Sequence, residues 1–147
     1  MSLTWGQSYY KIVLGPTWNE AEANAISLGG HLVTVNNSEE NEWIESEFSK
    51  EKYYYDGDSN PGDPETWTHF WLGGTDRDIE GTWKWVSGES WSFDGWISPL
   101  PNNAGNSGHD YLAGLFNITA GIGQGLGTYY WDDGQNKWDP NNNNLFR

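Results

Sequence analysis

The chain has 147 residues, a length that suits a single domain. Lys and Arg total 7 and Asp and Glu total 21, so the formal net charge is −14. This balance argues against nucleic-acid binding, which needs a basic face, and against docking on an anionic membrane. No apolar run approaches the ~18 residues of a membrane span, so membrane insertion is not expected. Cysteine is absent, which excludes disulfides and thiolate chemistry, while aromatic residues make up 16% of the chain and can supply a packed core.

The first elements predicted are a strand and a helix. Residues 9–14 read as a strand that ends at the Gly-Pro pair 15–16. The capping box at 17–20 predicts a helix start, because the Thr17 hydroxyl can accept from the Glu20 amide. The two glycines at 29–30 predict its end. The buried face of this helix is expected to comprise Trp18, Ala21, Ala25 and Leu28.

A second short strand is expected at 31–35, followed by a second helix. Ser38 is the candidate N-cap, and Glu39 and Glu40 would lie in the first turn, where the helix dipole favours anions. The buried face of this helix is expected to comprise Trp43, Ile44 and Phe48.

The rest of the chain predicts short strands separated by long loops, which makes the fold class α+β. The expected strands are 70–74, 82–86, 111–116 and 128–131, and the expected loops are 53–69 and 87–110. Tryptophans on these strands favour core positions over ligand-binding positions. They are Trp71, Trp83, Trp85 and Trp131.

Several segments, in the right order, resemble a C-type lectin-like domain. Residues 18–22, 29–35 and 40–44 resemble its first half, and 71–76 with 80–85 resemble its central strand and the strand that follows. The resemblance implies two helices flanking two small antiparallel sheets, with a long ligand loop, in one domain over residues 1–147.

Two departures from the family concern the fold. Ala25 and Tyr111 stand where two of the family's disulfide cysteines would be, so we expect apolar packing to replace the bridge. The family closes its fold with a last strand that pairs with the first. Because the sequence stops at Arg147, about where that strand should begin, we expect the closing strand to be missing or atypical.

The resemblance also implies two calcium sites, whose hard cation prefers oxygen ligands. The first would use Asp76, Glu80, Asn103 and Asp110. In the second, the family's Glu-Pro-Asn motif reads Leu100-Pro101-Asn102, with Pro101 expected to be cis, and His109 stands at a Glu position. Leucine offers no oxygen and imidazole is a poor ligand for calcium, which leaves Asn102, Asp132 and Asp133. The residues expected to contact a ligand are Asn102, Asn103, Asp132, Asp133, Trp96 and His109.

These features favour a non-catalytic extracellular binding module, secreted or displayed on a cell surface, that recognises carbohydrate through the long loop with calcium. The alternative is a calcium-independent module of the same fold that binds a protein or another surface, which Leu100 and His109 favour. A glycan-acting hydrolase is the least favoured reading. No Ser-His-Asp order, phosphate loop or dinucleotide fingerprint is present in the sequence. The partner is therefore expected to be a glycan or a protein, and the chain to be part of a larger surface protein.

Overall fold

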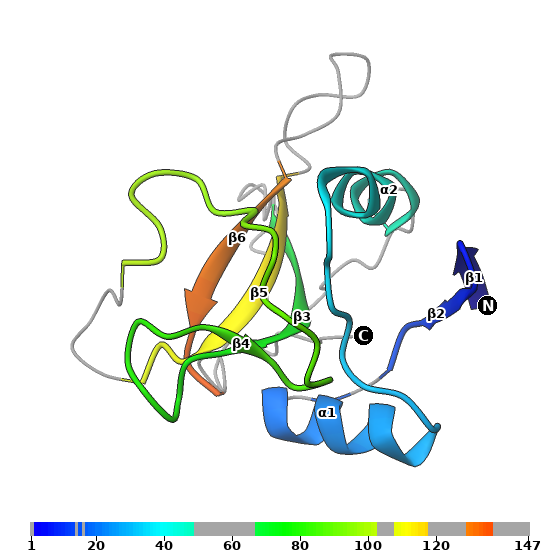
Figure 1. Cartoon of the computed structure of the whole chain (residues 1–147), viewed down its shortest axis with the longest axis horizontal. Coiled ribbons are helices and arrows are strands. Elements are labelled where there is room, and N and C mark those ends of the chain that lie inside the picture. The colour runs from blue at the N-terminus through cyan, green and yellow to red at the C-terminus, as the bar shows by residue number, and fades with distance from the viewer. Residues whose placement is uncertain are drawn as a thin grey trace, which may run out of the picture.

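Two helices and two antiparallel sheets make up the computed structural model of the chain, which confirms the α+β class expected from the sequence (Figure 1). The structure describes residues 2–13, 15, 17–48, 67–102, 108–117 and 129–136. The elements are β1 (Ser2–Trp5), β2 (Ser8–Lys11), α1 (Trp18–Ser27), α2 (Ser38–Phe48), β3 (Trp67–Thr75), β4 (Lys84–Trp85), β5 (Tyr111–Asn117) and β6 (Tyr129–Gly134).

The larger sheet carries the centre of the fold. Its strand order is β4-β3-β5-β6, and every neighbouring pair is antiparallel. The smaller sheet is the β1–β2 hairpin, turned at Gly6, whose φ of 57° suits glycine. The hairpin packs on α2, with the Trp43 ring 5.6 Å from Trp5 and 4.8 Å from Tyr10, and lies to the right in Figure 1.

Several strand boundaries differ from those predicted. Strand β1 was not predicted, and β3 begins at Trp67 inside the segment expected to be a loop. Strand β4 has only two residues of the five expected. The rest of the predicted loop, residues 53–66, lies outside the described residues. So does the tail 137–147, and the expectation that the closing strand is missing or atypical therefore stays a prediction.

Helix α1 forms largely as its sequence predicts. The Thr17 hydroxyl oxygen accepts from the Glu20 amide at 3.1 Å and donates to the Glu20 carboxylate at 2.7 Å. Gly29 follows the helix with a φ of 88°, a left-handed conformation that glycine adopts without strain. The prediction for Leu28 is wrong, because this residue lies beyond the last helical residue and is 59% exposed.

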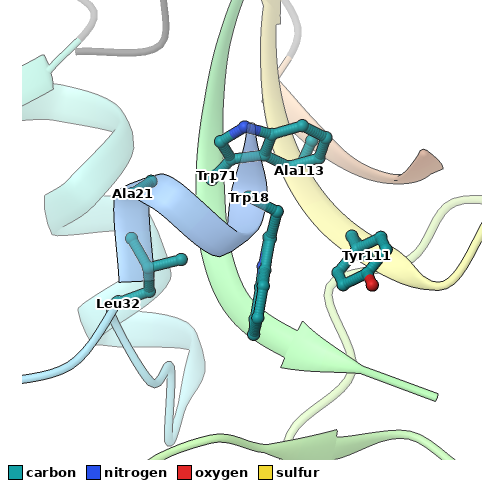
Figure 2. Packing of buried hydrophobic residues seen from close by; sticks show 6 residues of the cluster. All are labelled: Trp18, Ala21, Leu32, Trp71, Tyr111 and Ala113. Carbon is teal, nitrogen blue, oxygen red and sulfur yellow. The ribbon is translucent and has the colours of Figure 1, made fainter. Parts of the chain in front are cut away.

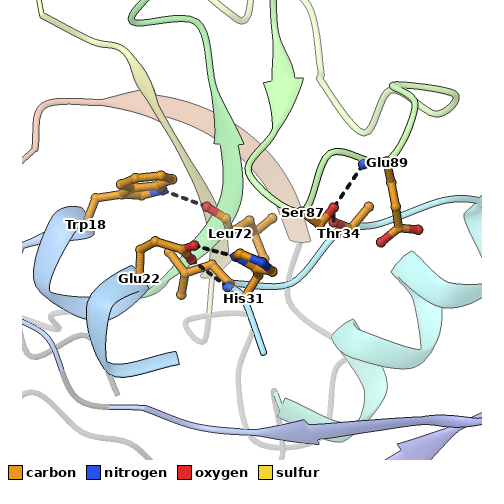
Figure 3. A network of polar contacts seen from close by, with 8 residues as sticks. Trp18, Glu22, His31, Thr34, Leu72, Ser87 and Glu89 are labelled. Atoms are coloured by element: carbon orange, nitrogen blue, oxygen red, sulfur yellow. Dashed lines mark hydrogen bonds and ion pairs between the residues drawn. The ribbon is translucent and has the colours of Figure 1, made fainter. Parts of the chain in front are cut away.

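The segment 31–36 contains no strand, so the strand predicted at 31–35 is wrong. Its backbone is held largely by side chains rather than by a strand ladder. The buried Glu22 carboxylate accepts from the Leu32 amide at 2.8 Å and contacts His31 Nδ1 at 2.6 Å (Figure 3). A single backbone bond, from the Gly73 amide to the Val33 carbonyl at 2.9 Å, joins the segment to β3.

The cap of α2 also differs from the prediction. Asn37, not Ser38, caps the helix, because the Asn37 side-chain oxygen accepts from the Glu40 amide at 2.8 Å. On the predicted buried face, Ile44 is 4% exposed and Trp43 is half-buried. The side chain of Phe48 lies outside the description.

Two hydrophobic clusters form the core. The first joins α1 to β3 and β5, and Figure 2 shows the Trp18 ring set between the helix and these strands. Tyr111 belongs to it, with its ring 4.9 Å from Trp18, and Ala25 is buried nearby in α1. Buried side chains that pack against the core therefore occupy both positions where the family has disulfide cysteines. The members of the first cluster are Trp18, Ala21, Leu32, Trp71, Tyr111 and Ala113.

The second cluster surrounds Trp131 of β6, which is fully buried. The Trp131 ring lies 5.7 Å from both Trp85 and Trp96, and Trp83 packs at the edge of the cluster. The preference of the strand tryptophans for core positions is thus confirmed at Trp71, Trp85 and Trp131. This packing anchors the long loop at Trp96, which forms an isolated bridge with Trp131. Leu100–Pro101 is a cis peptide, as expected, and so is Ser98–Pro99.

Candidate ligand and metal site

One end of the larger sheet gathers acidic side chains from three neighbouring strands. Asp76 follows β3, Asp110 precedes β5, and Asp132 and Asp133 lie in β6. The pairing of Thr75 with Tyr111 sets Asp76 beside Asp110, and the Asp76 amide donates to the Asp110 carbonyl at 3.2 Å. We call these four aspartates the carboxylate rim.

Asp76 is almost fully buried, at 2% exposure. Its Oδ2 accepts from the Gly81 amide at 2.8 Å, which closes the 76–81 turn. Its Oδ1 is buried and has no hydrogen-bond partner in the described part of the chain. Burial, and then the charges of Asp110 and Asp133, raise the pKa of the Asp76 carboxyl. A buried carboxylate oxygen without a donor is costly, and a cation placed against it would remove that cost.

Asp133 ties the long loop to β6. Its side chain is 1% exposed, and Oδ1 accepts from the Asn102 amide at 2.9 Å. His109 packs against the same residue, donating from Nδ1 to the Asp133 carbonyl at 3.1 Å, with Nδ1 3.7 Å from Asp133 Oδ2. The loop therefore meets the rim at Asn102 and His109.

The charge of Asp133 also affects the neighbouring Asp132 carboxyl. Its Oδ1 accepts from the Asp133 amide at 2.9 Å. Burial raises the pKa of the Asp132 carboxyl, as does the Asp133 charge, while His109 acts in the opposite direction. The rim thus concentrates negative charge that only a cation or protons can offset.

The structure brings some of the predicted site residues together and not others. Glu80 is exposed, within the turn that Asp76 closes. Trp96 is half-buried, and its ring lies 4.8 Å from Trp83 in an edge-to-face contact. Leu100 is half-buried, and Asn103 lies outside the described residues. The roles of these residues toward a ligand stay predictions.

The donor set of the rim suits calcium better than a softer metal. Its members offer carboxylate oxygens, and imidazole enters only through His109, whose Nδ1 is already bound to a backbone carbonyl. Within the described ranges, however, no three His, Asp or Glu side chains are arranged to hold a metal ion. The Asp76 oxygen without a hydrogen-bond donor is of the type that calcium prefers. A complete site would require the side chains of Asp110, Glu80 or Asn103 to converge on it.

Sequence reasoning missed two features of this site. It did not foresee that Asp76 divides its oxygens, one closing the turn at Gly81 and one left without a donor. The five-residue spacing from Asp76 to Gly81, whose φ is 76°, is a signal that could have indicated the turn. It also missed the bond from the Asn102 amide to Asp133, because that contact joins residues 31 positions apart.

Comparison with known proteins shows the family of the chain. The model of the Lectin C-type domain matches residues 15–112, which is more than half of the chain. The chain belongs to the C-type lectin domain family. Members of this family are generally binding modules rather than enzymes.

The relatives show the extent of the match to this C-type lectin domain. A perlucin-like protein from Mytilus galloprovincialis is 32% identical over 102 residues, covering 67% of this chain and 58% of that protein. The chain therefore matches little more than half the length of that relative.

Solved structures share the fold at low identity. The carbohydrate-recognition domain of the human scavenger receptor C-type lectin superposes with a TM-score of 0.63 at 22% identity, covering 91% of this chain and 86% of that one. A calcium-independent type II antifreeze protein gives a TM-score of 0.63 at 21% identity, covering 93% and 84%. Within the described ranges, this lectin domain has no helix long and apolar enough to cross a membrane.

Proposed function

We propose that the chain is a single non-catalytic binding domain that recognises carbohydrate at the carboxylate rim and long loop with the help of calcium. The observation that carries the proposal is the buried Asp76 Oδ1, which lacks a donor in the described part of the chain and lies near two further carboxylates. A divalent cation would neutralise this cluster and offer open coordination positions to ligand hydroxyls.

Two sets of residues would each hold a calcium ion. Asp76 and Asp110, with Glu80 and Asn103, would form one site beside the turn. Asn102, Asp132 and Asp133 would form the other, where the Asn102 amide already fixes the Asp133 carboxylate at 2.9 Å. His109 and Trp96 would border the ligand. These assignments rest on the resemblance to the family and on the positions of the aspartates.

Carbohydrate as the ligand class is supported by the relatives, which include a structure described as a carbohydrate-recognition domain. Secretion or surface display, as part of a larger surface protein, is proposed from membership of the family.

A glycan array, read in calcium and again in chelator, tests the proposal. We expect binding to at least one glycan class in calcium and its loss in chelator. Asp133→Asn should weaken this binding, because it removes a charge at the loop contact. The control Asp78→Asn changes an exposed carboxylate in the neighbouring turn, outside the rim, and should bind as the unmodified chain does.

A calcium-independent module for proteins or other surfaces is the second candidate. Leu100 and His109 favour it, because neither supplies the oxygen that a calcium-bridged sugar needs, and a calcium-independent antifreeze protein shares the fold. Binding that persists in chelator, or a protein ligand with no glycan signal, would support this candidate and contradict the first.

A further inference from the structure

A short apolar part of the long loop lies next to the carboxylate rim. Ile97 is 43% exposed, Pro99 and Pro101 are exposed, and Leu100 is half-buried. We call residues 97–101 the apolar segment. Exposed aliphatic groups that are consecutive in the chain and border a proposed binding site are candidates for direct contact with the ligand.

The start of the apolar segment is fixed on the larger sheet. The Trp131 amide donates to the Gly95 carbonyl at 3.4 Å, and a Cβ at Gly95 would lie 2.5 Å from the Trp131 ring, so the loop backbone packs directly on β6. The Leu100 amide then donates to the Ile97 carbonyl at 2.7 Å, which closes a turn within the segment. The exposed aliphatic side chains are therefore presented by a backbone with defined contacts.

The end of the apolar segment meets the rim. The Asn102 amide donates to Asp133 Oδ1 at 2.9 Å. Leu100 precedes Asn102 by two residues, so their Cα atoms lie within about 8 Å of each other, because consecutive Cα atoms are at most about 3.8 Å apart. A ligand bound to an ion at Asp133 would therefore have the apolar segment as its neighbour.

The chemistry of the apolar segment favours one kind of ligand surface. Apart from the Ser98 hydroxyl, its side chains have no hydrogen-bond donors or acceptors. A sugar hydroxyl covered by Leu100 would lose its hydrogen bonds to water and gain none from that side chain, which disfavours binding. A methyl group in the same place would bury apolar surface on both molecules and favour binding.

We propose that the apolar segment selects saccharides that carry a methyl group, the 6-deoxyhexoses, with Leu100 as the main specificity residue. This inference rests on the proposed function, because hydroxyls of the sugar would bind a calcium ion at the rim. The methyl group of the same sugar would contact Leu100 and Ile97. The leucine that supplies no oxygen to the ion would then determine which sugars the site accepts.

Four methyl glycosides in two matched pairs test this inference. The pairs are L-rhamnoside with L-mannoside and L-fucoside with L-galactoside, and within each pair the first sugar has a methyl group where the second has a hydroxymethyl group. Titration of the whole chain in calcium is followed by the backbone amide resonances. In at least one pair we expect the deoxy sugar to bind about tenfold more tightly and to shift the amides of Ile97 and Leu100.

Three variants locate the selectivity, which is measured as the ratio of the two affinities within a pair. Leu100→Ala should reduce the ratio to about twofold or less, because the contact with the methyl group is lost. Leu100→Gln has a similar size but carries a donor and an acceptor, so it should shift the ratio towards the hydroxylated sugar. Leu28→Ala, at an exposed leucine beyond the end of α1, is the matched control and should leave the ratio unchanged.

The outcomes separate this inference from the proposed function. Equal affinities within both pairs, or a preference for the deoxy sugar that survives Leu100→Ala, would overturn the inference and leave calcium-dependent sugar binding in place. If none of the four sugars binds while the glycan array shows other ligands, the inference alone fails. If the array is also blank in calcium, the proposed function fails with it. If the Leu100 variants do not fold, the matched pairs on the unmodified chain still decide.

Discussion

Asp76 is the residue of the rim that carries a buried carboxylate oxygen without a hydrogen-bond donor among the described residues. The residue is 2% exposed, and only one of its two carboxylate oxygens accepts a hydrogen bond within the described residues. Without a cation, this charge is held in the fold at a cost. The same residue was predicted as a calcium ligand from its place in the family pattern, but its burial and its divided oxygens were not, because they depend on the backbone of Gly81 and on neighbouring strands.

The first prediction concerns Asp76→Asn. In calcium-free buffer, we expect this variant to be more stable than the unmodified chain by about 1–3 kcal/mol, because an unpaired buried charge is removed. Chemical denaturation in chelator measures the difference. In saturating calcium the unmodified chain should be the more stable of the two, because only the unmodified chain is stabilised by binding the ion.

Asp78→Asn is the control for that experiment. Asp78 is exposed and lies two residues away, where Lys84 lowers the pKa of its carboxyl. The response of this variant to calcium should match that of the unmodified chain. A calcium response that survives Asp76→Asn would contradict the assignment of Asp76 as a ligand.

The second prediction concerns pH. Because burial raises the pKa of Asp76 above its ordinary value of 3.8, the folded chain holds this proton to higher pH than the unfolded chain does. Stability from this group is therefore lost as pH rises through the folded pKa, and the raised pKa of Asp132 acts in the same direction.

Denaturation at several pH values, with unmodified chain and Asp76→Asn side by side in chelator, isolates the contribution of Asp76. The stability advantage of the variant should be smallest near pH 4 and larger at pH 7. An advantage that does not change over this range would show that Asp76 has the same pKa folded and unfolded.

At the scale of elements, the contact between β3 and the segment 31–36 is tight. The Gly73 amide bonds to the Val33 carbonyl at 2.9 Å, and a Cβ at Gly73 would lie 2.6 Å from the Leu32 carbonyl oxygen. A side chain of any size must push the backbone of the segment away from β3. The absence of a side chain at this position thus fixes how closely the two elements approach.

The third prediction is that Gly73→Ala destabilises the fold by about 1–3 kcal/mol, the usual cost of overpacking. Gly30→Ala is the matched control, because a Cβ there meets no atom within 4 Å and should change stability by under about 0.5 kcal/mol. Both are measured by denaturant unfolding. Equal stability of the two variants would mean that the segment can move away from β3 at no cost.

Local sequence signals predicted some elements and failed for others. Helix α1 was predictable because Thr17 and Gly29 act within a few residues of the helix they bound. The strand expected at 31–35 did not form because Glu22, nine or ten residues earlier, bonds the backbone and a neighbouring side chain at this point. Asn37 replaced Ser38 as a cap because both are good caps and only the backbone conformation separates them.

At the scale of the whole molecule, the family was predictable because its motifs recur in order along most of the chain. The place of Trp131 on a predicted strand indicated that it is core, and the family pattern named Asp133 as a candidate ligand. The detailed site was only partly predictable, since the Asn102–Asp133 and His109–Asp133 contacts join the long loop to β6 across more than twenty residues.

A net charge of −14 makes the molecule as a whole sensitive to cations. Calcium binding at the carboxylate rim would stabilise the fold at a specific site, which general screening of charge would not do. Sodium at the same ionic strength should therefore fail to reproduce the stabilisation by calcium, and thermal unfolding in matched salts measures this fourth prediction. Equal shifts in melting temperature with the two salts would mean that screening alone stabilises the chain.

Calorimetric titration of the whole chain with calcium tests the central claim most directly. We expect a saturable binding isotherm that is lost in Asp76→Asn and retained in Asp78→Asn. A titration with no saturable heat, or one that Asp76→Asn leaves unchanged, would contradict calcium binding at the carboxylate rim.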